Sequence, residues 1–505
     1  MEPLEADGKR GASMRFVEKP GPAPRHGRVS GRLPRGVRLW LSFVAGAAVA
    51  LASFAVVPAF AQVVGGDPGL DTGSNSNACP KEESRVEVLG AKVFDADCLR
   101  DLTTAGTQET LHTEKDDWNG LNASGTKNPS GIGGLQIDGY FPDSSRTNTN
   151  NGWKHDSQFV LRFPNRWNGK LVITGAPGVR AQYASDFIIS DFVLGKGYAF
   201  ASTDKGNTGV NFYDDGSKPG GSIAEWHRRV TELTIAAQDV VRQRYGREPD
   251  YTYMTGISNG GYLTRWALEN TPGLYDGGVD WEGTLFRAEG PNLLTYLPTT
   301  LANYPEYEAT NDRQAYRNIV DAGFAPRSKF LWDEYYTNYW DLTQRIYREE
   351  FDPGYDGELK GGVPFCRPGT PNCDADYEYH KRPEKVKDAV RNVQLTGRIG
   401  KKMITLHGSL DSLLPIRTDS NVYRGLVRDA GGASAPHRYY RIGGGDHVDS
   451  FYDKYPGRLR PILPCHRKAF GMLERWVEDG REPPESRFVP RPEGGDVVNS
   501  CAIGG

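Results

Sequence analysis

The sequence predicts an α/β fold, in which a mainly parallel central sheet carries helices on both faces. Two continuous apolar segments of strand length, at 171–174 and 198–203, indicate strands that are buried on both sides. Helical patterns separate the predicted strands, and alternation of strands with helices favours parallel pairing. The 505 residues are enough for one large domain with an insertion or for two smaller domains.

The elements follow in a clear order along the chain. Short β-like pieces between Gly, Asn and Asp clusters predict antiparallel strands over 85–163, before the two apolar strands. A long helix with apolar side chains at helical spacing is predicted up to Tyr245, with Ser222 and Glu225 as its capping box and Gly246 at its end. Further strands are predicted at 251–255, 402–406 and 437–442.

The N-terminal region has the composition of an export signal. Basic residues precede an apolar run at 39–57, which ends in an Ala-x-Ala pattern at Ala61. We therefore expect a signal peptide at 1–61 and a secreted protein, extracellular or periplasmic, with no stable membrane association after cleavage. The alternative is an uncleaved anchor, because about twenty apolar residues can span a bilayer. Residues 62–84 are predicted to be a disordered leader.

The charge balance gives no reason to expect a polyanionic partner. The chain has 61 basic and 64 acidic residues, and its formal net charge is -3. Nucleic-acid and anionic-membrane interfaces usually require an excess of basic residues. We therefore expect no nucleic-acid partner, and a small-molecule or oligomeric substrate that is neutral or weakly charged.

The cysteines indicate structural disulfides. All six lie after the expected cleavage site: Cys79, Cys98, Cys366, Cys373, Cys465 and Cys501. An even number in an exported chain favours disulfides, and no doubled Cys-x-x-Cys pattern indicates zinc. Cys366 with Cys373 would close a local loop, and Cys465 with Cys501 would fix the C-terminal tail, but other pairings stay open.

The alternation of strands and helices breaks at residues 285–394. This segment is dense in tyrosine, tryptophan and phenylalanine. An aromatic, partly helical insertion between two strands is typical of a lid over an active site. Its rings either form a small core of their own or line a pocket. The predicted organisation is a core at 85–284 and 395–505 with an inserted lid domain at 285–394.

The strongest local motif is Gly256-Ile257-Ser258-Asn259-Gly260, which stands between a predicted strand and a predicted helix. This is the context of the nucleophile elbow of α/β-hydrolases. The flanking glycines are needed because a Cβ atom in so tight a turn would collide with the neighbouring strand or helix. The turn presents the Ser258 hydroxyl at a helix N-terminus, where N–H groups favour negative charge.

A serine nucleophile needs a base, and the base needs an acid that fixes its tautomer. In α/β-hydrolases the acid and then the histidine follow the serine along the chain. Asp411 follows the predicted strand at 402–406 and is the expected acid, although Asp is also common in turns. Among nine histidines, His447 follows the last predicted strand after three glycines and is the expected base. His466 remains an alternative, and His407 is expected to support the acid loop.

The oxyanion of the tetrahedral intermediate needs backbone N–H donors. Asn259, directly after the nucleophile, is the first expected donor. The loop that follows the strand at 171–174 should supply the second, from Ala176 or else from Gly175, because Pro177 has no N–H. The alternative is that this loop is a plain glycine turn.

Several segments resemble the tannase and feruloyl esterase family in content and order. They are Phe-Val-Leu-Arg-Phe-Pro-Asn-Arg-Trp-Asn-Gly-Lys at 159–170, Gly-Tyr-Ala at 197–199, Ser-Thr-Asp at 202–204, Gly-Ile-Ser-Asn-Gly-Gly at 256–261, Tyr-Asp-Gly at 275–277 and Leu-Glu-Arg-Trp-Val-Glu-Asp-Gly at 473–480. The resemblance covers most of 139–484 outside the lid. It implies an α/β-hydrolase fold with a lid, no required cofactor, and cleavage of aromatic esters of the feruloyl or galloyl type.

Two features set this chain apart from the family's pattern. The family has cysteines beside the nucleophile and the base, which form a disulfide, whereas here Ile257 precedes Ser258 and Val448 follows His447. The Ser-Asn-Gly-Gly elbow is also similar to that of extracellular 3-hydroxybutyrate oligomer hydrolases, whose substrates are short aliphatic polyesters. The substrate class is therefore open between aromatic esters and hydroxybutyrate oligomers.

The resemblance also implies that the lid can hold a structural calcium ion. The candidate oxygen ligands are Asp352, Asp356 and Glu358, or Asp374, Asp376 and Glu378. Neither run has the full spacing of a known calcium loop, so solvated surface acids are the other interpretation and no firm metal site is predicted.

The function predicted from these observations is that of a secreted serine carboxylic-ester hydrolase that forms an acyl-enzyme. An exopeptidase or amidase with the same triad is one alternative. A binding protein that kept the fold and lost the chemistry is another, and the presence of Ser258, Asp411 and His447 in the expected order argues against it.

Overall fold

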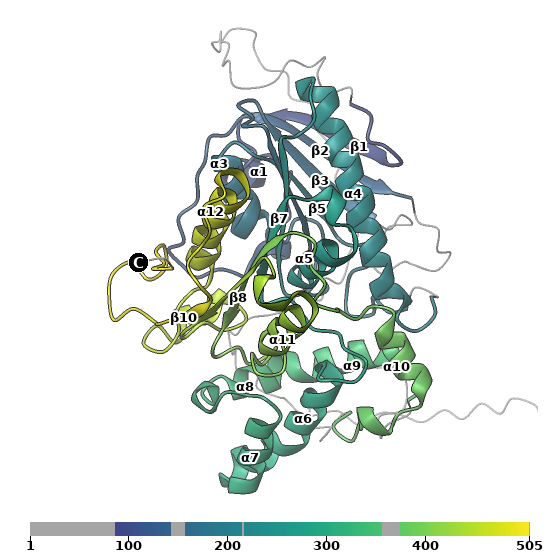
Figure 1. Cartoon of the computed structure of the whole chain (residues 1–505), viewed down its shortest axis with the longest axis vertical. Coiled ribbons are helices and arrows are strands. Elements are labelled where there is room, and N and C mark those ends of the chain that lie inside the picture. Colours follow the sequence, from purple (N-terminus) through teal and green to yellow (C-terminus); the bar gives the residue numbers. More distant parts are fainter. Residues whose placement is uncertain (1–85, 143–156, 215–216, 356–373, 504–505) are drawn as a thin grey trace, which may run out of the picture. The chain divides into compact units, whose positions relative to one another are not determined.

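The computed structural model describes residues 86–142, 157–214, 217–355 and 374–503. Within them ten strands form one sheet, in the order β1-β2-β3-β5-β4-β6-β7-β8-β9-β10 (Figure 1). The strands are β1 (Lys92–Leu99), β2 (Gly134–Phe141), β3 (Ser157–Pro164), β4 (Lys170–Gly175), β5 (Ala199–Thr203), β6 (Tyr251–Ile257), β7 (Gly277–Trp281), β8 (Lys402–Gly408), β9 (His437–Ile442) and β10 (Arg487–Val489). The pairs β1–β2, β2–β3 and β3–β5 are antiparallel, and all other pairs are parallel, as the sequence predicts.

Helices cover both faces of this sheet. They are α1 (Thr104–Thr110), α2 (Lys115–Trp118), α3 (Asp191–Gly195), α4 (Gly221–Tyr245), α5 (Asn259–Asn270), α6 (Leu293–Thr310), α7 (Arg313–Asp321), α8 (Trp332–Tyr335), α9 (Asp341–Phe351), α10 (Glu384–Arg391), α11 (Ser420–Gly431) and α12 (Leu463–Asp479). Figure 1 shows α4 and α5 on one side of the strands and α3 and α12 on the other. None of the helices in the described ranges combines the length and the apolar character needed to cross a bilayer.

Alternating side chains of the central strands build two separate apolar cores. On β4, Leu171 and Ile173 belong to the core that includes α4 and α5, whereas Val172 between them belongs to the core that includes α3 and α12. Successive side chains of a strand point to opposite faces, so each apolar strand is covered twice. This double burial is why these strands read as continuous apolar runs in the sequence.

The helix α4 starts differently from the prediction. Its N-cap is Gly220, with φ 79°, and no side chain of the cap residue makes a hydrogen bond, so the predicted capping box of Ser222 and Glu225 is wrong. Glu350 of α9 takes this role, because its Oε1 accepts the N–H of Ile223 at 3.1 Å. The cap therefore comes from a residue far away in the sequence. The predicted end at Gly246 is confirmed by its φ of 74°.

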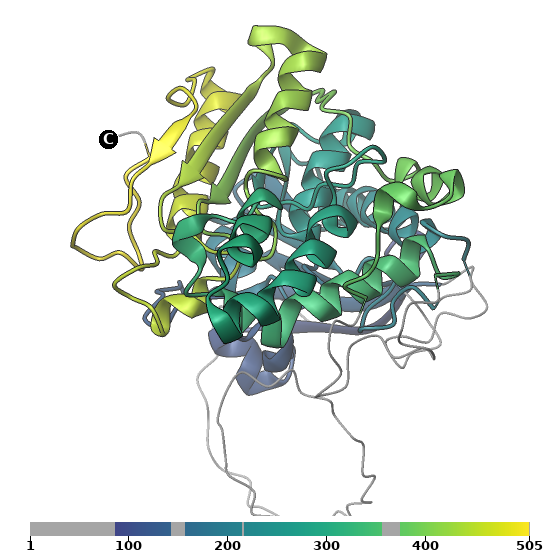
Figure 2. The same ribbon diagram turned by 90° about the horizontal axis from the view of Figure 1, so that it is seen from below.

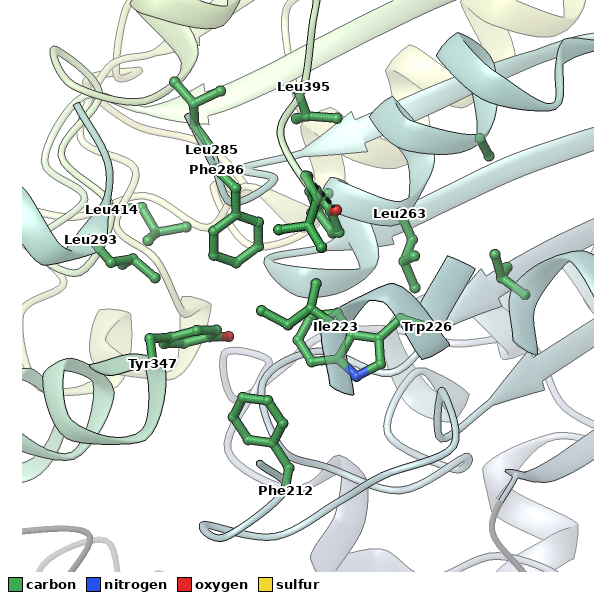
Figure 3. Close-up of a cluster of buried hydrophobic side chains, with 14 of the residues drawn as sticks. Phe212, Ile223, Trp226, Leu263, Leu285, Phe286, Leu293, Tyr347, Leu395 and Leu414 are labelled. Carbon is green, nitrogen blue, oxygen red and sulfur yellow. Dashed lines mark hydrogen bonds between the residues drawn. The ribbon is translucent and has the colours of Figure 1, made fainter. Parts of the chain in front are cut away.

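The segment between β7 and β8 contains α6 to α10. Figures 1 and 2 show these helices gathered at one end of the sheet. Their aromatic residues do not form an isolated small core. Tyr347 and Phe286 belong to the same buried cluster as Ile223 and Trp226 of α4, and Figure 3 shows these four side chains close together. The insertion therefore shares the main core of the protein.

The predicted pairing of Cys465 with Cys501 is confirmed, and it joins α12 to the C-terminal tail. Cys98 is also disulfide-bonded. The predicted pair Cys366–Cys373 lies outside the described residues, as do Cys79, the expected signal peptide and the expected leader.

We expect the double variant Cys465→Ala/Cys501→Ala to unfold more easily than the wild type. The bridge closes a loop of 36 residues, and a loop of this length reduces the entropy of the unfolded chain by an amount worth about 3 to 4 kcal/mol. The free energy of unfolding in urea would measure the loss. Ser500→Ala, at an exposed position beside Cys501, is the control, and equal stability of the double variant and this control would contradict the prediction.

Candidate active site

Ser258 occupies a sharp turn between β6 and α5. Its backbone has φ 57° and ψ -119°, a region that non-glycine residues adopt at a cost of about 1 to 3 kcal/mol and that is concentrated at active sites. The N–H of Ser258 donates to the carbonyl of Trp281 at 3.0 Å, and its own carbonyl accepts the N–H of Tyr262 at 2.8 Å. These bonds fix the turn from both sides.

Glycines make this turn possible because backbone approaches backbone directly. A Cβ atom on Gly256 would lie 2.5 Å from the carbonyl carbon of Gly260, and one on Gly260 would lie 2.4 Å from the carbonyl oxygen of Gly175. Both distances are far below van der Waals contact, and the obstacles are backbone atoms that cannot rotate away. The Gly-x-Ser-x-Gly spacing therefore serves the steric role that the sequence analysis gave it.

The structure brings Ser258, His447 and Asp411 together at the carboxyl ends of β6, β9 and β8. The Ser258 Oγ lies 3.1 Å from His447 Nε2, and His447 Nδ1 lies 2.9 Å from Asp411 Oδ2. The serine and the histidine are 189 residues apart in sequence. All three side chains are buried or nearly so. This geometry matches a serine nucleophile, a base and an orienting acid.

Asp411 is held as an anion by several donors. Its Oδ1 accepts the N–H groups of Leu413 and Leu414, each at 2.8 Å, and His407 Nε2 lies 3.2 Å from its Oδ2. Burial alone would raise the pKa of Asp411, but the charge of His447 and the hydrogen bonds from both histidines outweigh it and hold the pKa well below its ordinary value. Asp411 is therefore ionised at neutral pH.

The other histidines near the sheet have structural partners. His466 Nε2 lies 2.7 Å from Thr255 Oγ1 inside the core, and burial lowers the pKa of His466 to about 3. The structure does not bring His466 into contact with Ser258 or Asp411. His407 Nδ1 lies 2.6 Å from Ser420 Oγ, which ties the acid loop to α11 in the way expected of a supporting residue.

The loop expected to supply the second oxyanion donor differs from the prediction. The N–H of Ala176 donates to the carbonyl of Thr203 at 2.9 Å, so it continues the pairing of β4 with β5 and is not free for a substrate. Gly175 is itself the last residue of β4. Farther along, the N–H groups of Gly178 and Val179 have no hydrogen-bond partner among the described residues.

Asn259 links the nucleophile turn to this loop. Its Nδ2 donates to the carbonyl of Gly178 at 3.0 Å. The Tyr347 hydroxyl from α9 lies 2.7 Å from Nδ2 and 2.9 Å from Oδ1 of Asn259, and Thr284 Oγ1 donates to Oδ1 at 3.1 Å. The side chain of Asn259 is thus fully engaged, and its backbone N–H opens the helix α5, where it has no helical acceptor.

The insertion also contacts the acid and base loops. The Tyr335 hydroxyl donates to Asp446 Oδ2 at 3.0 Å, one residue before His447, and Trp340 Nε1 donates to the carbonyl of Ser412 at 2.6 Å, one residue after Asp411. Both aromatic side chains are completely buried. The insertion is therefore bonded to the catalytic loops as well as packed on the core.

The described calcium candidates have other partners. Asp352 Oδ2 accepts Arg382 Nε at 2.6 Å, and Asp374 Oδ2 accepts Arg348 Nε at 2.8 Å. These arginines already neutralise the two carboxylates, which does not fit a calcium ligand set. Asp356 and Glu358 lie outside the described residues. Among the described residues, two clusters of acidic and histidine side chains are close enough together to hold an ion, and neither lies in the insertion. One is Asp95, Asp97 and His112, and the other is Glu282, Asp411 and His447.

Two models of known protein families match parts of this chain. A family model described as tannase and feruloyl esterase matches residues 144–280, and a model for 3HB-oligomer hydrolase matches residues 373–504. The resemblance stated from the sequence is confirmed. The first match contains Ser258, and the second contains Asp411 and His447.

Two curated relatives show the range of similar proteins. A D-(-)-3-hydroxybutyrate oligomer hydrolase of Cupriavidus metallidurans is 32% identical over 105 residues, which are 20% of this chain and 14% of the relative. A probable feruloyl esterase of Arthroderma benhamiae is 26% identical over 167 residues, which are 30% of each chain. The aligned stretches thus cover less than a third of either relative.

Among solved structures, an esterase from Aspergillus oryzae superposes with a TM-score of 0.50 at 13% identity, and the match covers 82% of this chain and 92% of that one. The chain has the α/β-hydrolase fold. The predicted fold class is therefore confirmed.

Some residues of the site escaped the sequence analysis. Glu282 lies 3.7 Å from His447 Nδ1. It follows β7, a strand that was not predicted from the sequence, so the position of this acid at a strand end was not recognised. Tyr335 and Tyr347 stood among many aromatics of the insertion, and nothing in the pattern distinguished them from core residues.

We expect Gly260→Ala to disable Ser258, because the new Cβ would push the loop at Gly175 away from the nucleophile. A displacement of about 1 Å at a reacting centre can cost about 100-fold in rate. The rate at which a fluorophosphonate labels Ser258 would measure the effect. Gly273→Ala, which has open space around the added carbon, should be labelled like the wild type; undiminished labelling of Gly260→Ala would refute the steric argument.

Proposed function

We propose that this protein is a secreted carboxylic-ester hydrolase that acts through an acyl-enzyme on Ser258. The observation that carries the proposal is the unbroken line of contacts from Ser258 Oγ to His447 and on to Asp411, at 3.1 Å and 2.9 Å. A strained serine at a helix N-terminus, hydrogen-bonded to a buried imidazole, is difficult to explain as a structural device.

The reaction follows from these contacts. Ser258 Oγ attacks the ester carbonyl while its proton passes to His447 Nε2, and ionised Asp411 stabilises the imidazolium through Nδ1. The tetrahedral intermediate then collapses, the C–O bond to the alcohol breaks, and the alcohol leaves with the proton from Nε2. Water activated by His447 adds to the acyl-enzyme and releases the acid and the free serine.

The oxyanion of the intermediate has two sources of donors in this proposal. The N–H of Asn259 at the start of α5 is the first. Because the N–H of Ala176 is bonded to Thr203, the second comes from Gly178 or Val179 farther along the loop. The hydrogen bond from Asn259 Nδ2 to the Gly178 carbonyl supports this assignment, because it fixes the two donor segments relative to each other.

The substrate proposed first is an aromatic ester of the feruloyl or galloyl type. Tyr347 of the insertion contacts the Asn259 side chain and packs against Phe212 and Phe286, and aromatic rings beside the nucleophile turn suit a flat apolar acyl group. The similarity to 3-hydroxybutyrate oligomer hydrolases makes short aliphatic polyesters the second candidate. The reaction itself requires no cofactor, and the insertion is proposed to act as the lid of the site.

We expect Ser258→Ala to lose at least about 10⁴-fold in kcat on every ester that the wild type cleaves, because removing the nucleophile abolishes the covalent step. A panel of ferulate, gallate and 3-hydroxybutyrate esters, assayed beside amino-acyl amides, would measure this loss and the acyl preference together. Faster turnover of hydroxybutyrate esters would favour the second substrate class, and faster turnover of amides an amidase.

The exposed Ser434→Ala is the matched control. Full activity of Ser258→Ala would contradict the assignment of Ser258 as the nucleophile. Absence of a fluorophosphonate adduct on Ser258 in folded wild-type protein would instead favour a binding protein.

A second prediction concerns Tyr347. Its hydroxyl contacts both polar atoms of the Asn259 side chain, so Tyr347→Phe should loosen the oxyanion donors and lower kcat by about tenfold or more, given that loss of one oxyanion donor costs about 10²- to 10³-fold. Steady-state kinetics would separate kcat from KM. Tyr379→Phe removes an equally buried hydroxyl that donates to the Ala288 carbonyl away from the site, and equal kcat values of the two variants would count against the role of Tyr347.

A further inference from the structure

Glu282 is a buried acid that the proposed triad does not use. It follows β7 directly, its side chain has no exposed surface, and its φ is 51°. Its N–H donates to the carbonyl of Leu406 at 2.8 Å, and its Oε1 accepts the N–H of Gly408 at 2.5 Å. Non-glycine residues rarely adopt the left-handed region. Where they do so inside a protein, the surrounding structure must hold them there, and such positions are concentrated at functional sites.

The sheet places this acid beside the base. The strands β7, β8 and β9 are neighbours, so Glu282, Asp411 and His447 emerge at adjacent carboxyl ends. Glu282 Oε2 lies 3.7 Å from His447 Nδ1, and one ligand atom of each of the three residues lies within 4.8 Å of the others. Glu282 thus approaches the same imidazole nitrogen that Asp411 holds.

The outer oxygen of this acid is unused. Glu282 Oε2 is buried and has no hydrogen-bond partner among the described residues. Burial, and then the negative charge of Asp411, raise the pKa of Glu282 well above its ordinary value. Of these two neighbouring acids, Asp411 is therefore the one that ionises first.

We propose that Glu282 is a second acid of the catalytic site, able to orient the His447 imidazole when the Asp411 carboxylate is absent. The inference rests on the proposed function, because it concerns the base of the same triad. In the wild type Glu282 is a positioning residue beside Asp411.

Loss of the charge at position 411 would recruit Glu282. The repulsion from Asp411 disappears, so the pKa of Glu282 falls and the carboxylate forms more readily. A shift of about 1 Å brings Oε2 from its present 3.7 Å to the distance of a charge-assisted hydrogen bond with Nδ1. His447 would then keep its proton on Nδ1, and Nε2 would remain free to accept the proton of Ser258.

The neighbouring groups set the pH at which this occurs. Besides Asp411 and His447, Asp446 and Asp449 also face Glu282, and their charges raise its pKa. The acid that replaces Asp411 therefore needs a higher pH to ionise than Asp411 itself, whose pKa is lowered. Activity that depends on Glu282 should rise with pH across a range where wild-type Asp411 is already ionised.

The experiment compares kcat as a function of pH for the wild type, Asp411→Asn, Glu282→Gln and the double variant. We expect Asp411→Asn to exceed the double variant by at least about tenfold at pH 9, since a carboxylate on the base is worth up to about 10⁴-fold in kcat. This ratio should grow from pH 6 to pH 9. Glu282→Gln alone, which keeps the shape of the side chain and leaves Asp411 in place, should lower kcat much less than Asp411→Asn.

The matched control is Asp411→Asn/Asp191→Asn, which removes a buried acid that is bonded to Thr104 and has no contact with His447 or Glu282, and which should keep the residual activity of Asp411→Asn. If Asp411→Asn does not fold, Asp411→Ser with and without Glu282→Gln gives the same comparison. Equal kcat values of Asp411→Asn and the double variant at every pH would overturn the proposal, as would a loss in Glu282→Gln as large as in Asp411→Asn. Failure of the proposed function itself would appear separately, as full activity of Ser258→Ala.

Discussion

The backbone of α5 at Gly260 approaches the carbonyl oxygen of Gly175 so closely that no side chain fits between them, and the same is true of Gly256 and Gly260. These contacts fix β4, β6 and the start of α5 as one rigid unit. The hydroxyl of Ser258, the N–H of Asn259 and the loop after β4 are all parts of it. The remaining side chains of the site only need to reach this unit from neighbouring strand ends.

The distribution of charge among the acids around His447 is governed by the free-energy cost of burying charged groups. Asp411, Glu282 and Asp446 are all buried, and three adjacent carboxylates would repel each other strongly in a medium of low polarity. The donors are distributed unequally: Asp411 has two backbone N–H groups and two histidines, whereas Glu282 has the N–H of Gly408. Burial and the charge of Asp411 raise the pKa of both Glu282 and Asp446. These contacts favour the negative charge on Asp411 over its two neighbours.

The sequence predicted correctly those features that depend on a few consecutive residues. Apolar strands buried on both faces, the stop at Gly246 and the spacing around Ser258 each depend on a few consecutive residues, and they predict the strands, the end of α4 and the elbow. The chain order of acid and base selected His447, which the structure places in contact with Ser258, and Asp411, which it places in contact with His447.

The failures concern interactions between segments that are distant in sequence. The N–H of Ile223 is capped by Glu350 rather than by the predicted box, and the N–H of Ala176 is taken by Thr203. Glu282 is close to His447 only because β7 and β9 both flank β8. Such contacts depend on how elements pack, and periodicity along a single segment carries no information about them.

The residues beside the nucleophile and the base, Ile257 and Val448, have a consequence for the conditions under which this site can exist. Both belong to the same buried apolar cluster, at the positions where the resembling family places a cystine. The described cystine between Cys465 and Cys501 joins α12 to the tail instead. The junction of elbow and base loop therefore needs no oxidant to form, and thiol reductants have no bond to cut there.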